Sequence, residues 1–496
     1  MDGGRCLDVA LYFPFISAST AQKEITPMNK TVRMIGYIVC ASLAIALAGG
    51  IGIVKSLQLS QSPAPTGLAD TVVPLAAPPY DASKPTVVIV LGNSLTEATD
   101  FLGPYAMFAA SGAYNIYAVA ASNTLRTLTG GLDVVPQLSF AELASQLQGA
   151  PDIIVVPAMN DVEAPLNVPV LDWLRQHGHG QTILFSWCAG AEVLAASGLI
   201  DGKSVTTHWG NIDGFERTYP AVNWQRGQRY IDLIDSDRLL TTGGLTSGID
   251  ATLHLLTRLN GTAVATKVAQ ILHLPDSPFV ENPHMPQYTS EIADSIFLLD
   301  AAFTWPKRQT GVWLYDGVGE LDLAAVVDVY AVSAMDQMYS VANVPSVVSR
   351  YGLQLVPRWQ AQELPALDRL LIAGGVGAGQ VAQNLPTELG SGGVSVTILQ
   401  NDQSPTFAFT LALEDFAREH DVASAMFAVK RLEVRSPLNL VGSQWPLHLL
   451  IIPVLAGLTG GIAFAGLAWL SRRRFAFGGN QTRFFGTAPK GKVSRV

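Results

Sequence analysis

Hydrophobic residues along this chain form two long uncharged runs and, between them, many short runs separated by polar and turn-forming residues. Short, continuous, β-branched runs are typical of buried parallel strands, and helical periodicity between them indicates covering helices. The expected strands are 86–91, 116–121, 153–157, 182–187, 232–235 and 239–244, and the expected helices are 102–111, 170–177 and 247–259. The alternation predicts an α/β domain at residues 85–286, with a largely parallel sheet covered on both faces.

The two long runs, 34–54 and 447–470, are each long enough to cross a bilayer as a helix. Basic residues lie in the leading segment 1–33 and in the tail 471–496, which starts with three arginines. Because basic residues favour the cytoplasmic side, we expect both ends there, with the soluble bulk outside the cytoplasm of a plasma or inner membrane.

Two interpretations of the first run remain open. It is either a retained signal anchor or the core of a cleaved signal peptide, with Met28 as the start and Ala46-Leu47-Ala48 as a small-residue cleavage site. Either interpretation sends the following residues across the membrane.

The remaining segments are two connecting segments and a second globular region. Residues 55–84, rich in Pro, Ser and Ala, predict a linker, and residues 287–309 predict a connector with a short helix at 290–304. Residues 310–436 follow as a second globular region that ends in an amphipathic helix at 409–430.

Charge and cysteine content exclude some partners. The net charge is −9 and the middle of the chain has no basic stripe, so nucleic acid is not an expected partner. The cysteines are Cys6, Cys40 and Cys188, and the isolation of Cys188 argues against a structural disulfide there. We expect no cofactor and no metal ion.

Cys188 occupies the most informative position in the chain. It follows the apolar run 182–187 and precedes a helical pattern, and this strand–cysteine–helix order is that of a nucleophile elbow. Gly190 would let the helix approach the strand, and N–H groups at the helix start would favour a thiolate. The alternative is an inert, small core residue.

Several ordered stretches resemble the ThiJ/PfpI family of the class I glutamine-amidotransferase-like superfamily, and within it the amino-terminal domain of AraC-type regulators and the isonitrile hydratases. The resemblance implies a flavodoxin-like sandwich. It rests on Asp100-Phe101-Leu102-Gly103-Pro104, Ser186-Trp187-Cys188-Ala189-Gly190-Ala191, Gly198 to Lys203, Thr206-Thr207-His208-Trp209 and Gly243 to Asp250.

This resemblance implies roles for individual residues. Cys188 would be the nucleophile, Asp100 the acid that holds or moves a proton beside the thiol, and His208 a further catalytic residue. The backbone N–H groups of Ala189 and Ala158 would stabilise an oxyanion. Asp100 could also cap a helix starting near Leu102, and His208 could be a packing residue.

Two differences from the family's motifs weaken the assignment of any particular reaction of the family to this chain. Ala189 stands where isonitrile hydratases have threonine, and residues 157–159 read Pro-Ala-Met where proteases of the family have Pro-Gly-Gly.

The region 310–436 resembles the start of the same family. Asp322 corresponds to Asp100, and 370–375 resembles the third strand with its glycine turn, but no cysteine follows residue 188. We therefore expect a degenerate second copy without a nucleophile, which forms an internal pseudo-dimer with the first domain; a homodimer is the other possibility.

Two classes of function follow. The first is a membrane-anchored module that senses a small ligand or redox change through an exposed, low-pKa Cys188 and carries no DNA-binding domain. The second is a cysteine-dependent hydrolase or hydratase that acts on a small electrophile. A purely structural membrane scaffold is a third interpretation.

Overall fold

The computed structural model describes residues 29–60, 62–147, 149–386, 389, 394–399 and 406–478. Most of the expected leading segment 1–33 and most of the basic tail 471–496 therefore lie outside the described residues. The described chain divides into two compact units: the segment Ile45–Leu455, and the helical residues on either side of it.

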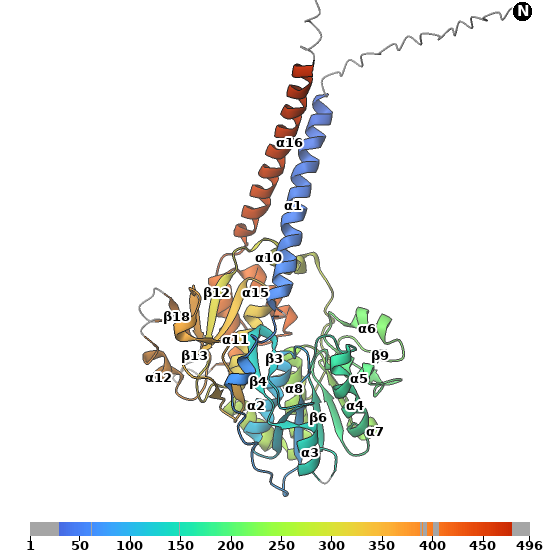
Figure 1. Ribbon diagram of the computed structural model, residues 1–496. Coiled ribbons are helices and arrows are strands. Elements are labelled where there is room, and N and C mark those ends of the chain that lie inside the picture. Colours follow the sequence, from blue (N-terminus) through green and yellow to red (C-terminus); the bar gives the residue numbers. More distant parts are fainter. Residues whose placement is uncertain are drawn as a thin grey trace, which may run out of the picture. The chain divides into compact units, whose positions relative to one another are not determined.

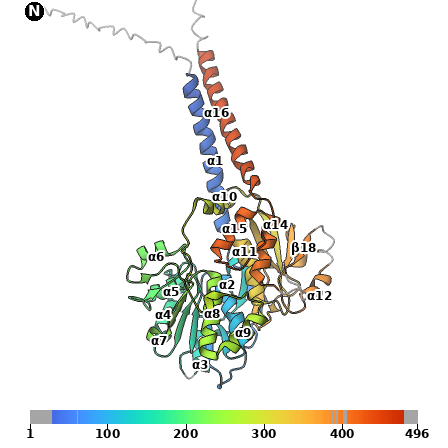
Figure 2. The ribbon, with the colours of Figure 1, turned by 180° about the vertical axis from the view of Figure 1, so that it is seen from behind.

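The smaller unit consists of the outer parts of two helices, α1 (Lys30–Ser60) and α16 (Ile451–Gly478), which run side by side (Figures 1 and 2). The rings of Tyr37 and Phe464 meet edge to face at 4.8 Å. A Cβ on Gly460 would overlap the carbonyl of Cys40, so the glycine permits the close approach of the two backbones. By length and composition, Lys30–Leu59 and Leu447–Ser471 are two helices capable of crossing a membrane.

The larger unit contains a seven-stranded sheet in the order β10-β11-β7-β6-β1-β2-β5, parallel except for β10. The six expected strands are present, together with β5, which was not predicted. Their bounds are β1 Thr86–Val90, β2 Asn115–Ala120, β5 Leu138–Ser139, β6 Ile153–Val156, β7 Ile183–Ser186, β10 Tyr230–Leu233 and β11 Leu239–Thr242.

Alternate residues of the strands face two hydrophobic cores, as the period-2 geometry of a strand requires. One face packs against α2 (Ala98–Ser111), α8 (Leu245–Asn260) and α9 (Thr262–Ile271), and the other against α3 (Phe140–Gln146), α4 (Val168–His177) and α5 (Gly190–Ala196). The predicted α/β sandwich is confirmed. Smaller elements complete it: β8 Ser204–Val205, α6 Ile212–Thr218, β9 Asn223–Trp224 and α7 Ile234–Asp237.

Residues after 307 form a second sheet, in the order β16-β13-β12-β17-β18, with all pairs parallel. Its strands are β12 Arg308–Trp313, β13 Asp336–Ala342, β16 Trp359–Gln360, β17 Arg369–Ile372 and β18 Ser395–Ile398. The associated helices are α10 Ile296–Phe303, α11 Glu320–Val332, α12 Ala378–Gln383, α14 Ala408–Glu419 and α15 Val422–Arg431.

The two sheets share structure. β4 (Leu132–Val135) pairs antiparallel with β15 (Gln354–Val356) in a small sheet completed by β3 (Arg126–Leu128) and β14 (Val347–Val348). The α2 helix lies between the first sheet and α11, and one hydrophobic core runs through both halves. A helix that is buried on all sides is expected to lack a polar face. Nearly all residues of α2 are buried, in agreement with this expectation.

Three expected boundaries are wrong. The helix predicted at 102–111 begins at Ala98, so Glu97 rather than Asp100 is its N-cap. The helix predicted at 409–430 is two helices, because the Asp421 side chain accepts a hydrogen bond from the Ser424 N–H and starts α15. The α1 helix continues to Ser60, into the predicted linker, where Ser56 donates to the carbonyl of Ala301 in α10 (2.8 Å).

Candidate functional site

Cys188 lies at a sharp turn between β7 and α5, with a left-handed backbone (φ 50°). Such a conformation costs about 1–2 kcal/mol for a residue with a Cβ and needs support from its surroundings. The Cys188 N–H donates to the Thr242 hydroxyl (3.1 Å), and the Thr207 hydroxyl donates to the Cys188 carbonyl (2.9 Å). A Cβ on Gly190 would overlap the carbonyl oxygen of Val156, so only glycine lets α5 start here. The elbow geometry is that expected from the sequence.

Asp100 is the acid beside this thiol. It lies in the first turn of α2, is fully buried, and accepts the Ala158 N–H through Oδ2 (3.1 Å). Oδ1 has no nitrogen or hydroxyl partner among the described residues, and the Cys188 side chain is a hydrogen-bonding neighbour of the carboxyl group. Burial raises the pKa of Asp100 to about 8, although the Ala158 bond opposes the shift. The hydrogen bond with the Cys188 side chain also opposes the shift, as a thiol that donates to the carboxyl group would.

Two further carboxyl groups adjoin this pair, and the sequence analysis missed both. Asp328, from α11 of the second sheet, accepts hydrogen bonds from Thr99 through its N–H (2.9 Å) and hydroxyl, and from the Thr129 hydroxyl (3.0 Å). Burial, followed by the charges of Asp328 and Asp100, raises the pKa of Glu97 well above its usual range. Burial raises the pKa of Asp328 as well, and the hydrogen bond with Glu97 opposes that shift. The sequence signal for Asp328 is its position as the single charged residue in the apolar stretch 323–332.

His208 does not act on the thiol in this arrangement. Its Nδ1 accepts the Gly210 N–H (3.1 Å), and its Nε2 lies 3.0 Å from the Arg431 carbonyl oxygen. The Arg431 guanidinium also lies 2.7 Å from each ring nitrogen. Burial and the adjacent Arg431 guanidinium hold the pKa of His208 well below its usual range. The ring is neutral and both nitrogens are engaged, which favours the packing interpretation over catalysis.

The two backbone N–H groups expected to stabilise an oxyanion, those of Ala189 and Ala158, are in different situations. Ala189 directly follows Cys188 and is the N-cap residue of α5. The Ala158 N–H is already donated to Asp100, so it is not available to an oxyanion in this conformation.

Residues 430–434, which we call the cover segment, come from the end of α15 and lie over the site. Leu432 accepts the Thr246 N–H through its carbonyl (3.2 Å), and the Glu433 carbonyl accepts from Arg229 (3.1 Å) and from the Thr246 hydroxyl (2.7 Å). Arg431 is close enough to lower the pKa of Cys188 and of Asp100 electrostatically.

The covered thiol differs from the exposed, acidic thiol expected from the sequence. Cys188 is only 4% exposed. Burial, followed by the Asp100 carboxyl, raises the pKa of the Cys188 thiol well above its usual range, and Arg431 only partly opposes this. The expectation of an exposed thiol is therefore wrong, and burial opposes the low pKa that the start of α5 was expected to favour.

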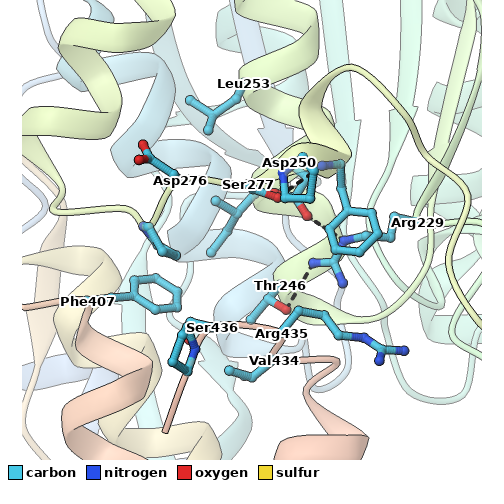
Figure 3. Close-up of a pocket in the computed structure, with 15 residues that line it drawn as sticks. Arg229, Thr246, Asp250, Leu253, Asp276, Ser277, Phe407, Val434, Arg435 and Ser436 are labelled. Carbon is cyan, nitrogen blue, oxygen red and sulfur yellow. Dashed lines mark hydrogen bonds and ion pairs between the residues drawn. The ribbon is translucent and has the colours of Figure 1, made fainter.

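Two cavities adjoin the cover segment. The smaller, about 80 Å³, lies between Arg229 and Asp250 on one side and Phe407 and Arg435 on the other (Figure 3). The larger, about 300 Å³, is lined by Thr207 and Trp209. Cys188 lines neither cavity, so a molecule in either one meets the neighbours of the elbow and not the sulfur.

Comparison with known proteins shows which family the first sheet resembles. Residues 85–258 match the DJ-1/PfpI family. Isonitrile hydratase of Pseudomonas putida is 31% identical over 183 residues, which is 36% of this chain and 75% of that protein. The transcriptional regulator CdhR of Pseudomonas aeruginosa is 31% identical over 119 residues, 24% of this chain, and the chain covers 34% of the regulator's length.

Among solved structures, a ThiJ/PfpI family protein from Pseudomonas syringae aligns over 43% of this chain and 89% of its own, at 23% identity and a TM-score of 0.34.

Proposed function

Because this chain belongs to the DJ-1/PfpI family, we propose that it is a membrane-anchored sensor, in which a small molecule binds beside Cys188 and the second sheet reports the event. The observation that carries this proposal is the cover segment. A site kept for turnover needs an entry path for its substrate, whereas here the Cys188–Asp100 pair is closed by residues that belong to another sheet. Binding that favours an open cover segment would shift a population between two states.

The α15 helix offers a route for the signal. At its carboxyl end is the cover segment. At its amino end, Ser424 donates to the buried Asp300 of α10 (2.9 Å), and Asp421 caps the helix. His448, in the 3-10 turn Leu447–Leu450 directly before α16, is within electrostatic reach of Asp421. A helix of ten residues is about 15 Å long and moves as a rigid element, so a shift at one end reaches the other.

The membrane part of the proposal rests on composition. Two helices are long and apolar enough to span a bilayer, and basic residues lie next to the outer end of each. The positive-inside tendency then assigns the two sheets to the extracytoplasmic side.

A sensing role is tested by hydrogen exchange on the full chain in detergent, with Cys6→Ser and Cys40→Ser so that Cys188 is the only thiol. Complete modification with methyl methanethiosulfonate should increase exchange in the cover segment, in α15 and in residues 447–450. A Cys188→Ser chain treated identically should not change. An effect confined to residues 183–196 would refute signal transmission through α15.

The alternative is a cysteine-dependent hydratase, favoured by the identity to isonitrile hydratase and by the intact Cys188–Asp100 pair. Addition of water to an isonitrile gives the N-substituted formamide, so this activity is measured by formamide release from an alkyl isonitrile. Turnover that is lost in both Cys188→Ser and Asp100→Asn would establish the hydratase in place of the sensor. Formamide release equal to that of the Cys188→Ser protein would exclude it.

A further inference from the structure

Glu433, in the cover segment, is held in an unusual setting. Its backbone is left-handed (φ 54°) and its side chain is fully buried. The carboxyl group lies over Gly243 and Gly244, where a Cβ would be 2.8 Å from Oε2 and 2.9 Å from Oε1, respectively. Any other residue at these two positions would fill the space that the carboxyl group occupies, so the glycines form a cradle for it.

The surroundings of this cradle suit a negative charge. It lies at the start of α8, a helix of 16 residues whose N–H groups carry partial positive charge, and the Ser247 hydroxyl donates to Oε2. Burial raises the pKa of Glu433 above its usual range, and the positive charge of Arg229 opposes that shift. Oε1 is buried and has no hydrogen-bond partner of ordinary geometry among the described residues. The site therefore holds the Glu433 carboxyl group but provides no hydrogen-bond donor to its Oε1 among the described residues.

The same carboxyl group is close to the reactive centre, because its charge contributes to raising the pKa of the Cys188 thiol. The cavity of Figure 3 adjoins the cradle through Arg229, Thr246 and Val434, and its volume of about 80 Å³ leaves room for only a few atoms beyond a carboxylate.

We propose that the glycine–serine cradle at the start of α8 is the ligand site of this protein, that its ligand is a small carboxylate, and that Glu433 fills it from within in the closed state. The inference rests on the sensing function proposed above and names its ligand class. A ligand that binds in the cradle displaces the Glu433 side chain. The cover segment then moves, Arg431 leaves His208, and Cys188 becomes exposed.

The cradle is tested first in a Glu433→Ala chain carrying Cys6→Ser and Cys40→Ser. Sodium acetate should raise its melting temperature by several degrees and saturably, whereas sodium chloride at equal ionic strength and acetamide should not. A further Ser247→Ala substitution should weaken this rescue. If Glu433→Ala does not fold, Glu433→Gly, which also empties the cradle and suits the left-handed backbone, takes its place.

The displacement of Glu433 by a ligand is tested in a chain that keeps Glu433. Acetate should increase the alkylation rate of Cys188 by iodoacetamide several-fold and saturably, and chloride should leave it unchanged. Equal effects of acetate and chloride in both experiments would overturn the carboxylate site. They would leave the sensing proposal intact, because the hydrogen-exchange experiment with the modified thiol uses no carboxylate.

Discussion

The Asp328 carboxylate of α11 accepts the backbone N–H of Thr99 at 2.9 Å, one residue before the acid that faces Cys188. The two residues are 229 positions apart, on two helices, one of which contacts a strand of the first sheet and the other a strand of the second. The second sheet therefore contributes directly to the electrostatics of the site, because the charge of Asp328 raises the pKa of both Glu97 and Asp100.

Asp328→Asn should destabilise the protein by about 1–3 kcal/mol. Thr99 donates to one carboxylate oxygen and Thr129 to the other, and an amide group can accept only one of these buried hydrogen bonds. The measurement is the denaturant midpoint of the full chain. Asp172→Asn, in an exposed pair with Arg175, is the matched control and should change stability by less than about 0.5 kcal/mol. Equal midpoints for the two variants would contradict the role assigned to Asp328.

The contribution of Asp100 to stability should fall as pH rises from about 3.8, its usual pKa, to about 8, its pKa in the folded protein. In this range folded Asp100 keeps a proton, since its pKa is raised to about 8, while unfolded Asp100 has already lost it. The folded state then binds more protons, so each pH unit lowers the free energy of unfolding by up to about 1.4 kcal/mol per such group. Asp100→Asn should reduce this slope, as measured by denaturation at several pH values. An unchanged slope would mean that Asp100 is ionised in the folded protein.

Arg431→Ala should increase the alkylation rate of Cys188 by about tenfold, if the cover segment loses roughly 1.4 kcal/mol of closing free energy. Because Arg431 also lowers the pKa of the thiol, the rate profile should move to higher pH at the same time. Arg435→Ala removes an exposed cation just beyond the cover segment that packs on Tyr288, and should leave the rate unchanged. Similar rates in both variants would indicate that Arg431 does not hold the cover.

Gly190→Ala should cost about 3 kcal/mol or more, because the new Cβ would overlap the carbonyl oxygen of Val156. Gly214→Ala in α6 is the control: it has open space around it, and alanine is favoured over glycine within a helix, so stability should rise slightly. Thermal unfolding compares them. A small loss for Gly190→Ala would show that the elbow can relax.

The orientation is tested by a membrane-impermeant maleimide on intact cells. In a chain without its native cysteines, Ala144→Cys, exposed on α3, should be labelled, and Thr487→Cys in the basic tail should react only after lysis. Labelling of Thr487→Cys in intact cells would reverse the proposed orientation.

Much of the first sheet follows from the sequence itself. The alternation of β-branched runs and helical periodicity is a local property, and it predicted the strands near Val88 and Phe185 and the turn at Cys188 within a residue or two. The proximity of Asp100 to Cys188 came from family resemblance, because no local pattern links residues 88 positions apart.

Only the tertiary structure decided what surrounds that pair. The sequence predicted an exposed thiolate, since a cysteine at the start of a helix is acidic when water and the helix N–H groups are its only neighbours. Packing of α11 and the cover segment removes the water and adds Asp328 and Glu433, and burial then outweighs the helix. Elements are specified by nearby residues, but the burial and charge of a site depend on contacts made by segments that are hundreds of residues away.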